Sequence, residues 1–70
     1  MRRKSLFKNL VRDQRIGCQM TQVALAAKSG VSIATLNRLE LHHVPASTKT
    51  AVALGEALDC SVTRLFPYFK

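Results

Sequence analysis

The chain has little of what defines several other classes of protein. Its 70 residues include only four acidic residues, three glycines, two prolines and two cysteines. The few carboxylates offer no candidate acid–base pair, and no glycine-rich phosphate loop follows a strand. Neither cysteine has a neighbouring base that would activate its thiol. The sequence therefore argues against an enzyme, and we expect no cofactor, metal or small-molecule ligand.

Cysteine is also too scarce to define the fold. Cys18 and Cys60 are too few and too irregularly placed for a disulfide framework. Each stands where an apolar residue would fit, so the sequence favours two small buried thiols. A single disulfide is the alternative, and a reducing compartment disfavours it.

Long apolar runs are missing as well. The longest, Val23–Ala27, has five residues, whereas a membrane-spanning helix needs about 20. The basic N-terminal stretch MRRKSLFKNLVRD lacks the apolar core of roughly 7–15 residues that a secretory signal requires. We therefore expect a cytoplasmic protein, associated with the nucleoid if it binds DNA.

The pattern of apolar residues indicates an all-α fold. Valine, isoleucine and the aromatic residues never alternate with polar ones, and no dipeptide typical of a hairpin turn occurs. The hydrophobic content of 47% is typical of a folded domain. We expect one domain over residues 1–70, with 1–4 as a basic N-terminal arm and 67–70 as a C-terminal tail.

The charge points to a polyanionic partner. Eleven lysines and arginines against four acids give a net charge of +7. Such an excess in a small domain indicates nucleic acid first and an anionic membrane surface second, although a protein that is merely basic is also consistent with it. The N-terminal cations are either an arm that touches phosphate or a minor groove, or a solvated start. They are Arg2, Arg3, Lys4, Lys8 and Arg12.

Five short helices are expected. Ser5 is predicted to open the first, and Gly17 to end it. Thr21 is predicted to cap a second helix, which runs to about Ser29 and is followed by Gly30 in a left-handed conformation. The inner face of the first helix is expected to carry Phe7, Leu10, Val11, Gln14 and Cys18.

The second half of the chain continues in the same way. Ser32 is predicted to cap a third helix through about Leu41, and Pro45 prevents its continuation. Ser47 is predicted to cap a fourth helix over about 48–58, and Ser61 a fifth. The expected inner residues of the fourth helix are Ala51, Val52, Leu54, Gly55 and Leu58. The fifth helix carries Val62, Leu65 and Phe66.

The third helix has two distinct faces. On a helical wheel, Leu36, Leu39 and Glu40 fall in one arc, which should face the core. Arginine donates twice to guanine, asparagine pairs with adenine, and alanine or isoleucine touches a thymine methyl, although a solvated surface would explain the same residues. The opposite arc carries Ala34, Asn37, Arg38 and Leu41, with Ile33 and Thr35 at its edges.

The spacing across the break at Gly30 carries a family resemblance. Ala26 is small where two helices must cross, and Leu25, Val31, Leu36 and Leu39 fill the angle between them. The stretch TQVALAAKSGVSIATLNRLE resembles the pattern T-Q-x-x-L-A-x-x-x-G-V-S-x-x-T-I/L-x-x-x-E of the Cro/repressor-type, or xenobiotic-response-element, helix-turn-helix family. The likeness extends more weakly to VRDQRI before this stretch and to ALGEALDCSVTRLF after it.

The resemblance implies a compact five-helix, lambda-repressor-like DNA-binding domain with its helix-turn-helix at about 21–41. Its third helix would enter the major groove, and a homodimer would bind a two-fold operator with half-sites about 34 Å apart. A small Cro-like repressor fits this description. The positions that match DNA-contacting residues of the family are Gln22, Ser32, Ile33, Ala34, Thr35, Asn37 and Arg38.

The sequence departs from the family pattern in three ways. Val23 and Ala24 stand where acids are frequent, and they either pack against a neighbour or, as we favour, form helix at the surface. Ile33 stands where a polar residue is frequent, so it either contacts thymine methyl groups or packs inward. Ser29 replaces a usual apolar residue.

Two charged residues are predicted to pair inside the domain. Arg15 and Glu40 lie on or beside inner faces, and a lone buried charge costs several kcal/mol, so the two are expected to form an ion pair. Adjacent His42 and His43 diverge too much to bind a metal together, and a loop position near the DNA backbone suits them better. Further candidate phosphate contacts are Arg2, Arg3, Lys4, His43 and Lys49.

A protein-interaction module on the same scaffold, such as an antitoxin-like partner or an adaptor, is the alternative function. It would bind through Val23, Leu41 or the C-terminal segment Leu65–Phe69. The same segment is a candidate dimer seam, and local packing in the core explains it equally well.

Overall fold

The structure is a computed structural model that describes residues 7–69 of the chain. Within these residues the chain forms helices and no strand, which confirms the all-α prediction. The expected arm at residues 1–4, the helix start at Ser5 and the last residue of the tail lie outside the described residues. The helices are α1 (Val11–Gly17), α2 (Gln22–Ser29), α3 (Ile33–His42), α4 (Thr48–Ala57) and α5 (Val62–Leu65).

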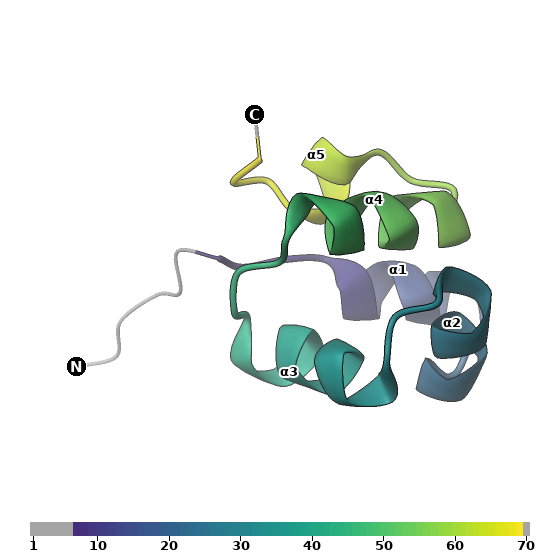
Figure 1. The fold of residues 1–70 in the computed structure, drawn as a ribbon. Coiled ribbons are helices and arrows are strands. Elements are labelled where there is room, and N and C mark those ends of the chain that lie inside the picture. The colour runs from purple at the N-terminus through teal and green to yellow at the C-terminus, as the bar shows by residue number, and fades with distance from the viewer. Residues whose placement is uncertain (1–6, 70) are drawn as a thin grey trace.

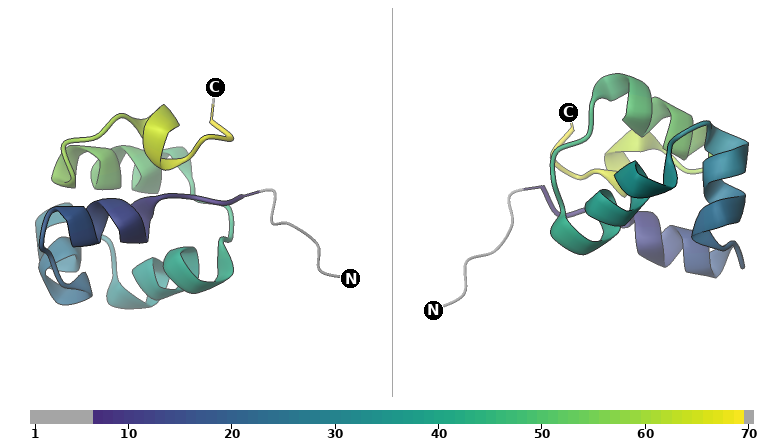
Figure 2. Two further views of the ribbon diagram at one scale, coloured as in Figure 1. Left: turned by 180° about the vertical axis from the view of Figure 1, so that it is seen from behind. Right: turned by 60° about the horizontal axis from the view of Figure 1, so that its bottom comes forward.

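The helices surround one apolar core. In Figure 1, α2 and α3 form the lower part of the molecule, α4 lies above them, α5 covers α4, and α1 runs behind. Figure 2 shows α1 from behind and α3 coming forward from below. The core residues come from every helix, and they are Val11, Leu25, Leu36, Leu39, Ala51, Leu54, Ala57, Leu58, Leu65 and Phe66.

Hydroxyl caps start four of the five helices, as predicted. Each capping side chain accepts a hydrogen bond from the backbone N–H three residues ahead, where a helix has no partner of its own. The N···O distances are 3.0, 3.1, 3.2 and 3.3 Å for Thr21, Ser32, Ser47 and Ser61 in turn. Each cap stabilises its helix by about 1 kcal/mol.

The prediction for the first helix was wrong at its start. The helix begins at Val11, where Asn9 performs two tasks at once: its Oδ1 accepts from the Val11 N–H at 3.1 Å, and its Nδ2 donates to the Leu39 carbonyl at 3.0 Å. Phe7 lies before this helix and Cys18 after it, and both are exposed. Seven residues make only two turns, which is too short for the inner face that we expected.

Two further burial predictions were wrong. Val52 is 41% exposed on α4, and Ala57 takes an inner position that we did not assign. The thiols are both free, but only Cys60 is partly buried, while Cys18 lies at the surface. The packing of α2 and α5 against α4 therefore determines which residues of α4 are buried, and the sequence of α4 alone does not reveal how these helices pack.

The C-terminal segment packs locally. Leu65 and Phe66 are fully buried, so a dimer seam through these two residues is excluded. The Phe66 ring packs against the rings of Tyr68 and Phe69, with centroids 6.0 and 5.8 Å away. The Tyr68 hydroxyl accepts a hydrogen bond from the Ala46 N–H at 3.0 Å, which ties the segment to the loop before α4.

Alanine substitutions at the three glycines are expected to act in different directions. A Cβ at Gly55 would lie 2.8 Å from the Cys60 carbonyl oxygen, and backbone cannot yield as a side chain does. We expect Gly55→Ala to lower the free energy of unfolding by about 1–2 kcal/mol, because overpacking outweighs the helix propensity gained. Gly30→Ala should cost about 1 kcal/mol, since φ is +79° there.

Gly17→Ala is the matched control. Nothing lies within 4 Å of its Cβ position, and its φ is ordinary. It should therefore raise the free energy of unfolding by about 0.5–1 kcal/mol. Urea denaturation of the three variants measures these changes. A Gly55→Ala variant as stable as Gly17→Ala would contradict the close approach of α4 to the backbone of Cys60, in the link before α5.

Candidate nucleic-acid interface

The outward face of α3, made of Ile33, Ala34, Asn37 and Arg38, is exposed, as the wheel predicts. Leu36, Leu39 and Glu40 on the other side of the helix are buried. Ile33 is 46% exposed and does not pack against the core. The inward alternative for Ile33 is therefore wrong.

The turn between α2 and α3 fixes where this face points. Gly30 ends α2 in the left-handed conformation, and its N–H donates to the Ala26 carbonyl at 2.9 Å. Two hydrogen bonds explain why Ser29 stands where the family usually has an apolar residue. Its Oγ donates to the Leu25 carbonyl at 2.7 Å and accepts from the Val31 N–H at 3.1 Å. A hydroxyl at this position thus binds the end of α2 to the turn, which an apolar side chain would not do.

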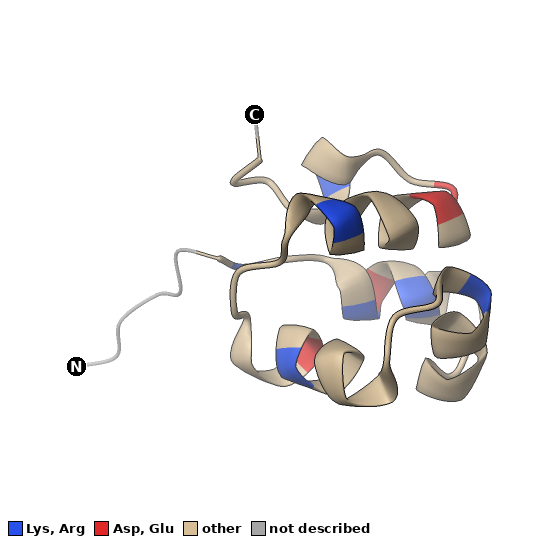
Figure 3. Cartoon of the chain, in the orientation of Figure 1, with Lys and Arg blue, Asp and Glu red and all other residues tan. Residues whose placement is uncertain are grey.

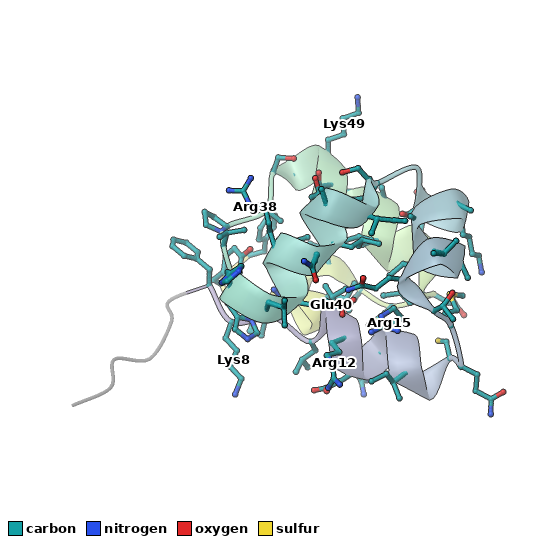
Figure 4. The ribbon with its side chains drawn as sticks, turned by 90° about the horizontal axis from the view of Figure 1, so that it is seen from below. Lys8, Arg12, Arg15, Arg38, Glu40 and Lys49 are labelled. Carbon is teal, nitrogen blue, oxygen red and sulfur yellow. The ribbon has the colours of Figure 1, made fainter. Side chains whose placement is uncertain are left out.

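The predicted ion pair braces α3 from behind. Arg15 Nε lies 2.8 Å from Glu40 Oε2, and Arg15 Nη2 lies 3.0 Å from Glu40 Oε1, a two-point contact between α1 and α3. Figure 4 shows the two side chains meeting between the helices. Arg15 Nη1 also donates to the Met20 carbonyl at 2.8 Å. The Glu40 side chain is only 2% exposed, so this arginine is what allows the carboxylate to remain buried.

The pair keeps Arg15 firmly charged. The hydrogen bonds to Glu40 raise the pKa of the Arg15 guanidinium above its ordinary value; burial opposes this rise, and the negative charge of Glu40 adds to it. No buried side-chain nitrogen or oxygen in residues 7–69 lacks a hydrogen-bond partner. The polar network behind α3 is thus complete, which favours one fixed orientation of the helix.

Gln22 and Ser32 are engaged within the protein. Gln22 Nε2 donates to Glu40 Oε1 at 3.1 Å, so it belongs to the brace. A primary amide has two N–H donors, so one is left for a phosphate. Ser32 Oγ caps α3 and donates to Thr35 Oγ1 at 2.9 Å, which directs both hydroxyl groups to the first turn of the helix itself.

Cations lie around the outward face of α3. Figure 4 shows Lys49 beyond the edge of α3 from which Arg38 projects, and Lys8 and Arg12 beyond the opposite edge of this helix. Glu40 is the only acid of α3, and it is buried and paired. The acids of the upper part of the molecule lie at the far end of α4, away from Lys49 (Figure 3). The fourth acid, Asp13, is exposed on α1 next to Arg12. Four cations against this one exposed acid leave this side of the described structure positive.

The remaining predicted contacts have different outcomes. Arg2, Arg3 and Lys4 lie outside the described residues. Lys49 is exposed in the first turn of α4. His43 is half-buried with φ +48° at the end of α3, and its Nδ1 accepts from the Asn9 N–H at 3.4 Å. In residues 7–69 no group of three or more histidines, cysteines or acids is placed to hold a metal ion.

Asn9 is the structural residue that sequence reasoning missed. It joins the start of α1 to the end of α3, and so supports the helix that carries the candidate interface. The available signal was local, because asparagine side chains often accept a hydrogen bond from the backbone N–H two residues ahead, as Asn9 does from Val11. Its contact with the Leu39 carbonyl had no local signal.

A model of the helix-turn-helix family matches residues 11–65, which include all five helices and the whole outward face of α3. The chain belongs to this family, in its Cro/repressor-type (xenobiotic-response-element) form, a family of DNA-binding transcription regulators. Searches of curated proteins and of solved structures gave no match. None of the helices between residues 7 and 69 has the length and apolar content needed to cross a bilayer.

Proposed function

We propose that the protein is a sequence-specific, double-stranded DNA-binding regulator, a small Cro-like repressor that inserts α3 into the major groove. One observation carries the proposal: Asn37 and Arg38 are exposed side by side on a helix whose opposite side is locked by the Arg15–Glu40 pair. Asparagine pairs with adenine and arginine with guanine through two hydrogen bonds each. A braced helix holds such groups in one geometry, which specificity requires.

The backbone of the DNA would be held on both sides of α3. The start of α2 offers free N–H groups and the second N–H of Gln22 to a phosphate. Lys49, in the first turn of α4, would neutralise another phosphate on the opposite side. These contacts fix the register of the helix in the groove, while Asn37 and Arg38 supply the sequence preference.

A homodimer would compensate for the short stretch of DNA that one domain can contact. With ten residues, α3 is about 15 Å long and spans only a few base pairs. A second copy on a two-fold related half-site, about 34 Å away, would double the contacts. Repression would follow from occupancy, since a dimer that covers a promoter in the cytoplasm blocks polymerase.

Arg38→Ala tests the proposal on duplexes selected by the protein from a random pool. We expect the variant to lose about 1–3 kcal/mol of binding free energy on the selected duplex and to relax the preference at one base position. Arg64→Ala is the control, because it removes the same charge from an exposed residue of α5, which α4 separates from α3. Equal losses on selected and random duplexes would show that Arg38 contacts only phosphate.

A protein-interaction module on the same scaffold is the second candidate. Val23 is 65% exposed on α2 and Leu41 is 62% exposed on α3, and both could contact an apolar partner. The exposure of Val23 supports its assignment to the surface within this chain. The two functions differ in their response to salt, which is taken up in the Discussion.

A further inference from the structure

We infer that Ile33 sets the sequence specificity of the interface by contacting the methyl group of a thymine. The inference rests on the proposed function, and it identifies the kind of base that the start of α3 requires. Ile33 is the first residue of α3 and is about half exposed, with no place in the core. In a helix-turn-helix protein, the N-terminal residues of the second helix are the ones that contact base edges.

The first turn of α3 presents hydrocarbon instead of hydrogen-bonding groups. Ile33 and Ala34 are exposed, and neither side chain has a donor or acceptor. The two hydroxyls of this turn, on Ser32 and Thr35, are hydrogen-bonded to each other, and Ser32 also caps the helix. In the major groove, the only apolar group at a base edge is the C5-methyl of thymine. Any other base would leave Ile33 against a polar edge.

Asn37 places this thymine relative to a second base. Residues four apart lie on the same side of a helix, so Ile33 and Asn37 face the groove one above the other. Their separation along the axis is about 6 Å, which is less than two base-pair steps. The thymine is therefore expected within two base pairs of the adenine that Asn37 would contact.

The charges around Ile33 favour DNA over a protein as its partner. Lys49 lies beside the first turn of α3, where it lines a hollow with Ser32 and Thr35. Arg38 follows about one and a half turns along the same helix, and the single acid of this helix is buried behind it. An apolar side chain surrounded by cations matches the major groove at a thymine, where an apolar methyl group lies between two rows of negatively charged phosphates. A protein hot spot would instead need a continuous apolar patch.

Uracil substitution tests the inference, because deoxyuridine differs from thymidine only by the absent methyl group. Each thymine of a duplex selected by the protein is replaced in turn, and the dissociation constant is measured. We expect one position near the adenine contact to weaken binding about three- to fivefold. Ile33→Ala should bind the thymine and uracil duplexes equally at that position. Ile33 is exposed, so the substitution should leave folding unchanged, and thermal melting of the variant checks this.

Leu41→Ala is the matched control, since it truncates another exposed aliphatic residue of α3. Leu41 lies about 12 Å further along the helix axis, so Leu41→Ala should keep the full sensitivity to uracil at the Ile33 position. Selected duplexes that tolerate uracil everywhere, or an Ile33→Ala variant that remains sensitive, would overturn the inference and leave specific DNA binding intact. A protein that selects no duplex at all would instead contradict the proposed function, and this inference with it.

Discussion

Arg15→Ala is expected to unfold the protein under conditions in which the parent is folded. The substitution leaves the Glu40 carboxylate buried with only Gln22 as a partner, and breaking a buried pair on one side costs about 3–5 kcal/mol. A single core in a domain of this size supplies only roughly the same amount. The Met20 carbonyl also loses its donor. Circular dichroism on heating should show loss of the cooperative transition.

Two variants separate charge burial from loss of packing. Arg12→Ala, on an exposed residue of the same helix, should melt within about 0.5 kcal/mol of the parent. The double variant Arg15→Met with Glu40→Leu removes both charges, and well-packed apolar replacements of a buried pair are often tolerated. It should therefore be more stable than Arg15→Ala. If Arg15→Ala melts like the parent, the pair does not hold α1 against α3.

Binding to DNA is expected to weaken about 1000-fold between 50 and 200 mM salt. This estimate assumes that a dimer neutralises about six phosphates, three through the cations of each protomer. Each contact releases counterions from the DNA, so added salt opposes binding. Lys8, Arg12 and Lys49 are the described candidates around the outward face of α3. A fluorescence titration on a random duplex at several salt concentrations gives the slope directly.

Lys49→Ala should reduce the magnitude of this slope by about 2 per dimer, and Arg64→Ala on α5 should leave it unchanged. The comparison tests the side of the molecule that faces DNA, because both variants lose one positive charge per protomer. A protein-interaction module would hardly bind the random duplex even at low salt. That result would move the assignment to the second candidate function.

Local signals in the sequence determined much of the fold. The caps at Thr21, Ser32, Ser47 and Ser61 were predictable because a capping hydroxyl bonds the N–H only three residues ahead in its own helix. The buried and exposed sides of α3 were predictable for a similar reason. Helical periodicity repeats within two turns, so a ten-residue helix already defines its faces.

The candidate site was predictable only in part. Asn37 and Arg38 lie on the outward face, as the wheel indicates, but whether Ile33 pointed outward was undecided in the sequence. Its wheel position is at an edge, where neighbouring helices determine burial. The contact from Gln22 to Glu40 likewise joins residues 18 positions apart and has no local signal.

The sequence alone thus determined that the domain has five helices, the caps of four of them, the turn at Gly30 and the two faces of the third helix. Only the tertiary structure decided that α1 starts at Val11 beside Asn9, that Val52 and Cys18 are exposed, and that Leu65 and Phe66 belong to the core. The physical reason is distance along the chain. A cap or a helix face is defined within one or two turns, whereas Asn9 bonds a carbonyl 30 residues away and Tyr68 a backbone N–H 22 residues away, contacts that exist only once the helices have packed.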